Sequence, residues 1–226
     1  MATPLAALIG GDEFRPVTVE VDRRIIQRLG RPAARVAVLP TAAAPENAPL
    51  AAANGVRHFR GLGVEAVAVM IVDAASANDE RLVAELDGVD LAYLAGGDPR
   101  YLLDALRDSL AWRRLVGLLT DGCAIAGSSA GAMVLGETMF YRREWSPALG
   151  LVPGICVLPH FQEWGTKVLP ELLDASRERG LTFLGIDGAT GCVGWGPEWE
   201  VAGPGAVTVI RAGGAEVFRS GSRIGL

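Results

Sequence analysis

The sequence predicts an α/β fold built on a parallel β-sheet, followed by a β-rich C-terminal part. Short apolar runs alternate with helical patterns over the first two thirds of the chain, which is typical of a parallel sheet covered by helices. The runs carry few polar residues, as expected for strands buried on both faces. At 226 residues, without a repeat or a linker, the chain is expected to be one domain over residues 1–226.

The expected parallel strands are short, and glycine or proline ends several of them. They cover residues 6–9, 35–40, 64–72, 91–95 and 124–126. Gly10 and Gly11 stop the first strand, and Gly96 and Gly97 stop the fourth. The fifth strand is very short and wholly apolar, which favours a position inside the sheet.

Helices are expected between these strands. They cover residues 17–29, 46–62, 79–86 and 101–120, the last as two helices broken near residues 108–109. Gly30 is suited to end the first helix, because glycine readily adopts the left-handed conformation of a C-terminal cap. Asn78 is the expected N-cap of the third helix.

The pattern changes after residue 132. Prolines at 147, 153 and 159 indicate a loop-rich stretch, and a helix is expected over residues 166–179. Short β-like runs separated by glycines follow, at residues 182–186, 192–195, 207–211 and 216–218.

The composition argues against several functions. A net charge of −5 includes no basic excess, which disfavours a nucleic-acid partner. The sequence has neither a long apolar run typical of a membrane span nor the pattern of a signal peptide. Cys123, Cys156 and Cys192 lack CxxC spacing, so we expect reduced thiols in a cytoplasmic protein.

The strongest chemical signal follows the fifth strand. Gly127, Ser129 and Gly131 match G-x-S-x-G, the nucleophile elbow. A serine at the tip of a tight strand-to-helix turn has a strained backbone, and glycines two positions away on either side prevent collisions there. The N-terminal amides of the following helix favour negative charge developing at the hydroxyl. A turn without chemistry is the alternative, but the apolar strand and helix around the motif favour a nucleophile at Ser129.

A serine hydroxyl needs a base within hydrogen-bond reach, and the chain has two histidines. His58 lies between two arginines in an expected helix, and we interpret it as a solvated surface residue. His160 follows an apolar run and a proline, where a loop can present it. We therefore predict His160 as the base, with a purely structural histidine as the alternative.

A second glycine-rich turn, at Gly96 and Gly97, ends the fourth strand. Glycines at a strand end allow a backbone N–H to approach a substrate. Gly97 can then supply one donor of an oxyanion hole and Ala130 the other. A simple turn into a helix starting at Pro99 explains the glycines equally well.

With these motifs the chain resembles the cyanophycinase and dipeptidase E (aspartyl dipeptidase) family of serine peptidases. The shared motifs follow one order along most of the chain: residues 9–12 (IGGD), 95–98 (AGGD), 127–132 (GSSAGA), 158–161 (LPHF) and 185–187 (GID). The resemblance implies a three-layer parallel-sheet sandwich like that of class I glutamine amidotransferases. It also implies Ser129 as nucleophile, His160 as base and an oxyanion hole near Gly97 and Ala130.

The resemblance leaves open which acid orients His160. The dipeptidase branch has an acidic residue after the serine at a spacing that falls here on Glu144, although Arg142 or Arg143 can pair with it at the surface instead. Asp187 is the second candidate. Family members often carry glutamate directly after the corresponding aspartate, whereas this chain has Gly188, which puts an acidic role for that loop in doubt.

The residues after His160 bear on the substrate. Cyanophycinases carry an arginine-rich run there, whereas residues 161–167 (FQEWGTK) contain one lysine and no arginine. The form of this motif is closer to the dipeptidase branch, so the resemblance implies hydrolysis of a small peptide through an acyl-enzyme, with an acidic N-terminal residue favoured. Arg100, Arg142 and Arg143 are the cations that can meet a substrate carboxylate, and each is equally well explained as a surface residue.

Other classes of protein fit less well. A glutamine amidotransferase would need cysteine at position 129, and a Rossmann protein would need G-x-G-x-x-G after the first strand. We expect no metal and no cofactor. Beyond a small peptide substrate we expect neither nucleic acid nor membrane as partner, and a homodimer stays open. The alternative function, which Gly188 keeps open, is a catalytically impaired family member that binds a small ligand or serves in an assembly.

Overall fold

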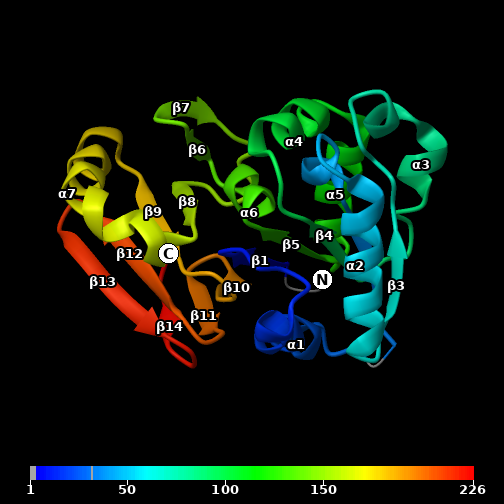
Figure 1. The fold of residues 1–226 in the computed structure, drawn as a ribbon, viewed down its shortest axis with the longest axis horizontal. Coiled ribbons are helices and arrows are strands. Elements are labelled where there is room, and N and C mark those ends of the chain that lie inside the picture. The colour runs from blue at the N-terminus through cyan, green and yellow to red at the C-terminus, as the bar shows by residue number, and fades with distance from the viewer. Residues whose placement is uncertain (1–3, 32) are drawn as a thin grey trace.

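A large mixed β-sheet runs through the middle of the protein (Figure 1). The computed structural model describes residues 4–31 and 33–226, and within these ranges the sheet has eight strands in the order β14-β11-β10-β1-β5-β4-β2-β3. Its parallel part consists of β1 (Leu5–Ile9), β5 (Ala124–Ser128), β4 (Leu91–Leu94), β2 (Arg35–Leu39) and β3 (Glu65–Ala68). Antiparallel strands continue it beyond β1: β10 (Gly191–Trp195), β11 (Glu198–Ala202) and β14 (Arg223–Ile224). The predicted parallel sheet is therefore confirmed, although β3 ends before the predicted residue 72.

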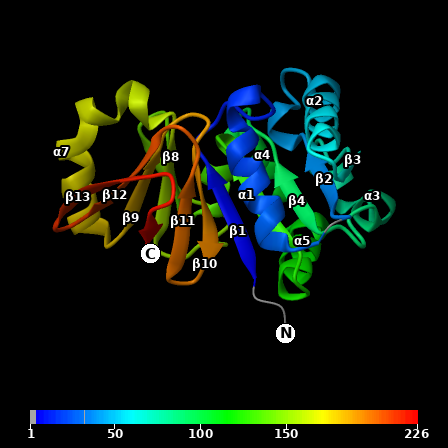
Figure 2. The same cartoon turned by 90° about the horizontal axis from the view of Figure 1, so that it is seen from below.

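Helices cover both faces of this sheet, because successive strand residues point to opposite sides. In β1, Ala6 and Leu8 belong to the core on one side, whereas Ala7 and Ile9 belong to the core on the other. The helices on the second side are α1 (Val19–Leu29) and α2 (Ala48–Gly61), and those on the first include α4 (Pro99–Leu106) and α5 (Leu110–Thr120) (Figure 2). The carboxyl ends of the parallel strands meet at one edge, where α/β proteins commonly bind ligands.

The predicted helices are present, with shifted ends. A short 3₁₀ turn precedes α1, which closes at Gly30 in the left-handed conformation (φ 63°), as predicted. The side chain of Asn47 accepts a hydrogen bond from Leu50 N–H and starts α2. Residues 101–120 form two helices, as predicted, because the Ser109 side chain caps the second.

The third helix, α3 (Glu80–Ala84), begins at a different cap from the predicted Asn78. The carboxylate of Asp79 caps it, accepting a hydrogen bond from Arg81 N–H at 2.8 Å. Asn78 Oδ1 instead accepts from Leu110 N–H at 3.0 Å. Its amide therefore connects this turn to the start of α5.

The C-terminal part contains a second sheet in the order β13-β12-β9-β8. Its strands are β8 (Ile155–Pro159), β9 (Thr182–Ile186), β12 (Ala206–Arg211) and β13 (Gly214–Arg219). Packed against this sheet is α7 (Phe161–Arg179), which begins before the predicted residue 166. The helix expected after Ser129 is α6 (Ala130–Leu135), and the stretch predicted to be rich in loops instead holds the hairpin of β6 (Thr138–Tyr141) and β7 (Glu144–Pro147), and β8.

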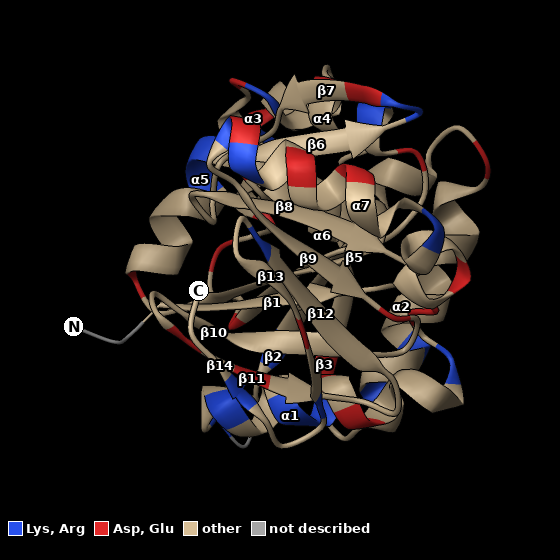
Figure 3. Cartoon of the chain, turned by 90° about the vertical axis from the view of Figure 1, so that its left-hand side faces the viewer, with Lys and Arg blue, Asp and Glu red and all other residues tan. Residues whose placement is uncertain are grey.

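Acidic and basic residues are interspersed along α7 and the neighbouring elements (Figure 3). No helix in the described ranges combines the length and the apolar character needed to cross a membrane.

The three thiols are predicted to be unreactive in the folded protein. Cys123, Cys156 and Cys192 are buried, and burial raises the pKa of each thiol to about 12, so the reactive thiolate is scarce at pH 8. We expect Ellman's reagent to label none of them in the native protein and all three in guanidinium chloride. The variant Ser220→Cys, at an exposed turn, should add one fast-reacting thiol under native conditions. Rapid native labelling of the wild type would contradict this burial.

Candidate active site

Three segments of the candidate site meet at the C-terminal end of β1. Consecutive backbone carbonyls there accept one hydrogen bond each: Ile9 from Ser129 N–H (2.9 Å), Gly10 from His160 N–H (2.9 Å) and Gly11 from Ala189 N–H (3.0 Å). Three consecutive residues at the end of β1 thus position the serine, the histidine and the loop after β9. Gly10 and Gly11 therefore contribute to the site through their backbone carbonyls, although they have no side chains.

Ser129 lies at a strained turn between β5 and α6. Its φ of 49° and ψ of −111° are unusual for a residue with a side chain, as the elbow requires. A Cβ atom at Gly127 would overlap the backbone of Gly131, and one at Gly131 would overlap the carbonyl of Leu94. The spacing of glycines in the motif therefore has a steric cause in this fold.

The structure brings His160 to Ser129. Nε2 of His160 lies 3.5 Å from Ser129 Oγ, the outer limit of a hydrogen bond, and catalytic hydrogen bonds are often this long without substrate. His160 is itself left-handed (φ 50°) and directly precedes α7. Its ring packs on Gly11, where any side chain would overlap the imidazole.

The amides predicted for the oxyanion hole line the same cavity as Ser129 and His160. Gly97 has a φ of 142°, and a side chain there would overlap the carbonyl of Ala42. The next residue, Asp98, donates its N–H to that carbonyl at 2.8 Å. Within residues 4–31 and 33–226, neither Gly97 N–H nor Ala130 N–H donates to another protein group, so both can donate to a bound ligand.

Neither acid predicted to orient His160 bonds to it. Glu144 is exposed on β7 and pairs with Arg100, not with the predicted Arg142 or Arg143. The carboxylate of Asp187 accepts a hydrogen bond from Ala206 N–H at 2.9 Å and thereby joins β9 to β12.

The acid that does approach the imidazole is Glu163, which the sequence analysis did not select. Its Oε1 lies 3.9 Å from His160 Nδ1, and the side chain is 67% exposed, so this is a loose contact that becomes an ion pair when the imidazole takes up a proton. The sequence signal for this contact is that Glu163 follows His160 by three residues at the start of α7, and side chains three residues apart lie on the same side of a helix. At Gly188, a side chain would overlap the carboxylate of Asp12, so Asp12 supplies negative charge beside this loop.

His58 is not the solvated residue that the flanking arginines indicated. Its side chain is 7% exposed, and Nε2 lies 2.7 Å from Oδ2 of the fully buried Asp22. Burial raises the pKa of the Asp22 carboxyl, and the hydrogen bond from His58 opposes that rise. The pair joins α2 to α1, so His58 has a structural partner of its own.

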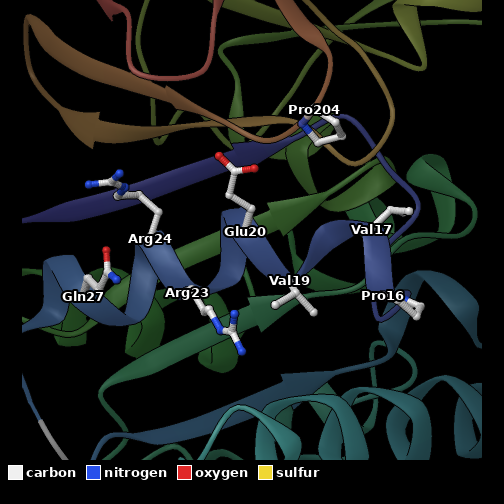
Figure 4. Close-up of a pocket in the computed structure, with 8 residues that line it drawn as sticks. All are labelled: Pro16, Val17, Val19, Glu20, Arg23, Arg24, Gln27 and Pro204. Atoms are coloured by element: carbon white, nitrogen blue, oxygen red, sulfur yellow. The ribbon is translucent and has the colours of Figure 1, made fainter.

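Two cavities meet at Ser129 and His160. One, of about 370 Å³, has Phe140, Tyr141 and Trp164 on its walls, with Arg142 over the ring of Tyr141. The other, of about 610 Å³, includes Asp12, Glu13 and Arg15. A hollow on α1, lined by residues such as Glu20 and Arg23 (Figure 4), shares no lining residue with either. No group of three or more His, Cys, Asp or Glu in the described part of the chain could hold a metal ion.

Comparisons with known proteins identify the family and the fold. The model of peptidase family S51 matches residues 6–189. Cyanophycinases from Synechococcus elongatus and Thermosynechococcus vestitus are each 28% identical over 222 residues, covering 91% of this chain and 67% of each relative. The crystal structure of a peptidase from an acI-B1 Actinobacterium has the same fold, with a TM-score of 0.86, 24% identity, and coverage of 99% of this chain and 97% of that one.

Replacing Gly11 by alanine should displace His160. The added methyl group would overlap the imidazole, and the backbone at residue 11 has a φ of 125°, which favours glycine. We expect the rate of Ser129 labelling by a fluorophosphonate to fall by about tenfold or more, as expected when a general base is lost. Gly61→Ala, where a Cβ meets nothing within 4 Å, is the control. Equal labelling of the two variants would contradict the placement of His160.

Replacing Glu163 and Glu144 one at a time by glutamine shows which of the two supports His160. Glu163→Gln removes the charge beside His160 and should slow fluorophosphonate labelling about two- to fivefold, the range of an exposed ion pair. Glu144→Gln breaks a pair with Arg100 on the hairpin and should leave the rate unchanged. A larger loss from Glu144→Gln would restore Glu144 as the orienting acid.

Proposed function

The chain belongs to the serine peptidase family S51, and from that membership we propose that it hydrolyses small peptides through an acyl-enzyme at Ser129. The observation that carries the proposal is the approach of His160 Nε2 to Ser129 Oγ at 3.5 Å, beside two backbone amides free to bind an oxyanion. A nucleophile, a base and oxyanion donors are the minimum set for acyl transfer.

In this mechanism Ser129 Oγ attacks the scissile carbonyl carbon while His160 Nε2 takes the hydroxyl proton. The amides of Gly97 and Ala130 bind the negative oxygen of the tetrahedral intermediate. His160 then gives its proton to the leaving amine as the C–N bond breaks, which leaves the acyl group on Ser129. Water, deprotonated by His160, hydrolyses this ester and restores the serine.

A short peptide with an acidic N-terminal residue is the proposed substrate. Arg142 lines the cavity of Ser129 and, within the described ranges, has no carboxylate partner, so it is available to a substrate carboxylate. Arg100 is engaged by Glu144, and Arg143 lines a neighbouring cavity. Because relatives at 28% identity are cyanophycinases, cyanophycin is a necessary test compound.

A catalytically impaired member of the family is the alternative, and it rests on Gly188. The structure offers a local reason for that glycine, because a side chain there would overlap the carboxylate of Asp12. The carboxylate of Asp12, from the segment after β1, therefore lies beside residue 188, where it also pairs with Arg15 at 3.1 Å. Gly188 therefore has a steric cause of its own and is not by itself a sign of a decayed site.

The proposal is tested by hydrolysis of a dipeptide panel that includes α- and β-linked aspartyl substrates. We expect turnover by the wild type and by the control Ser220→Ala, and a loss of about 10³- to 10⁶-fold in Ser129→Ala, because the nucleophile is gone. Amine release, followed by chromatography, measures the rates. Activity retained in Ser129→Ala would exclude this nucleophile. A wild type inert towards both the panel and a fluorophosphonate would favour the impaired alternative.

A further inference from the structure

The carboxylate of Glu13 bridges the two turns that form the candidate site. Its Oε1 accepts a hydrogen bond from Gly96 N–H at 2.7 Å, and its Oε2 accepts one from Ser128 Oγ at 2.8 Å. Gly96 directly precedes Gly97, and Ser128 directly precedes Ser129. One side chain therefore connects the turn of the oxyanion amide to the turn of the nucleophile.

Both ends of this bridge are closely fitted. A Cβ atom at Gly96 would lie 2.5 Å from Glu13 Oε1, so only glycine lets the carboxylate come so near the backbone. Ser128 is fully buried, and its hydroxyl cannot turn to bulk water if the carboxylate is removed. The residues on either side of Glu13 have positive φ, 61° at Asp12 and 63° at Phe14, a conformation that is costly for side chains as large as phenylalanine.

The turn that carries Gly97 is anchored on both sides, by Glu13 before it and by the carbonyl of Ala42 after it. Gly96 N–H bonds to Glu13, and Asp98 N–H bonds to the carbonyl of Ala42. Between these anchored amides lies Gly97 N–H, which donates to no protein group in the described ranges. With one anchor lost, the peptide group of Gly97 gains freedom to rotate, because glycine has few conformational barriers.

Resting on the proposed function, we propose that Glu13 is a positioning residue that aims the Gly97 amide relative to Ser129. It acts through the two turns and does not take part in proton transfer. Donors fixed in advance stabilise the oxyanion mainly in the transition state. The removal of Glu13 must therefore lower kcat more than it changes KM.

The test compares Glu13→Ala and Glu13→Gln with Glu85→Ala, which removes an exposed glutamate at the end of α3, away from both turns and both cavities of the site. We expect kcat for the best panel substrate to fall about 10- to 100-fold in Glu13→Ala, with KM within about threefold. Glu13→Gln keeps an acceptor for Gly96 and a donor for Ser128, so it should recover most of the rate. Glu85→Ala should behave as the wild type.

Amide exchange in protein labelled with ¹⁵N-glycine provides a readout that is independent of activity. We expect Gly96 N–H to exchange at least about tenfold faster in Glu13→Ala than in the wild type, and at nearly the wild-type rate in Glu13→Gln. If Glu13→Ala does not fold, Ser128→Ala, which removes one end of the bridge, takes its place in the kinetic test.

Three results for Glu13→Ala would overturn the proposal: an unchanged kcat, a change in KM alone, or an unchanged exchange rate of Gly96 N–H. An inert wild type would instead refute the proposed function, and the exchange rates would still decide whether Glu13 anchors the turn.

Discussion

Hydrogen bonds from Ser129, His160 and Ala189 to consecutive carbonyls at the end of β1 hold the candidate site together. Each bond contributes on the order of 1 kcal/mol, but their common origin matters more than their sum. Because the acceptors are three consecutive residues, the three loops cannot shift independently. β1 lies between β10 and β5 in the sheet, and its surroundings fix the segment in turn.

Steric limits follow from this arrangement. The imidazole of His160 occupies the space beside Gly11 that a side chain would take, and the backbone of Ala42 does the same at Gly97. At both positions a neighbouring group fills the space beside a glycine, so neither residue can carry a side chain. Ser128, adjacent to the nucleophile, adds a polar contact to Glu13 beneath the turn. The carboxylate of Glu13 lies so close to the backbone at Gly96 that no larger residue fits there.

The sequence predicts the parallel strands and the elbow well because both are local. Apolar runs ending at Gly10 or at Gly96 need no knowledge of distant residues. His58 was misread from its charged neighbours, although its spacing from the buried Gly55 and Phe59 carried a signal for the inner face of a helix.

Long-range contacts set the rest of the site. Glu144 satisfied the expected spacing, yet Arg100 takes its carboxylate. Glu13 reaches partners 83 and 115 residues away, and these contacts depend on strand order, which a single sequence does not reveal.

The hairpin of β6 and β7 forms a sheet of its own, while its residues Phe140 and Tyr141 line the cavity of Ser129. The wall of the cavity is thus built on an element whose strands pair only with each other in the described part of the chain. Evolution can lengthen, shorten or recompose such an appendage without disturbing the backbone at the end of β1. Under the proposed function, a change in this hairpin would alter the wall of the substrate cavity while the hydrogen bonds that hold Ser129 and His160 stay in place.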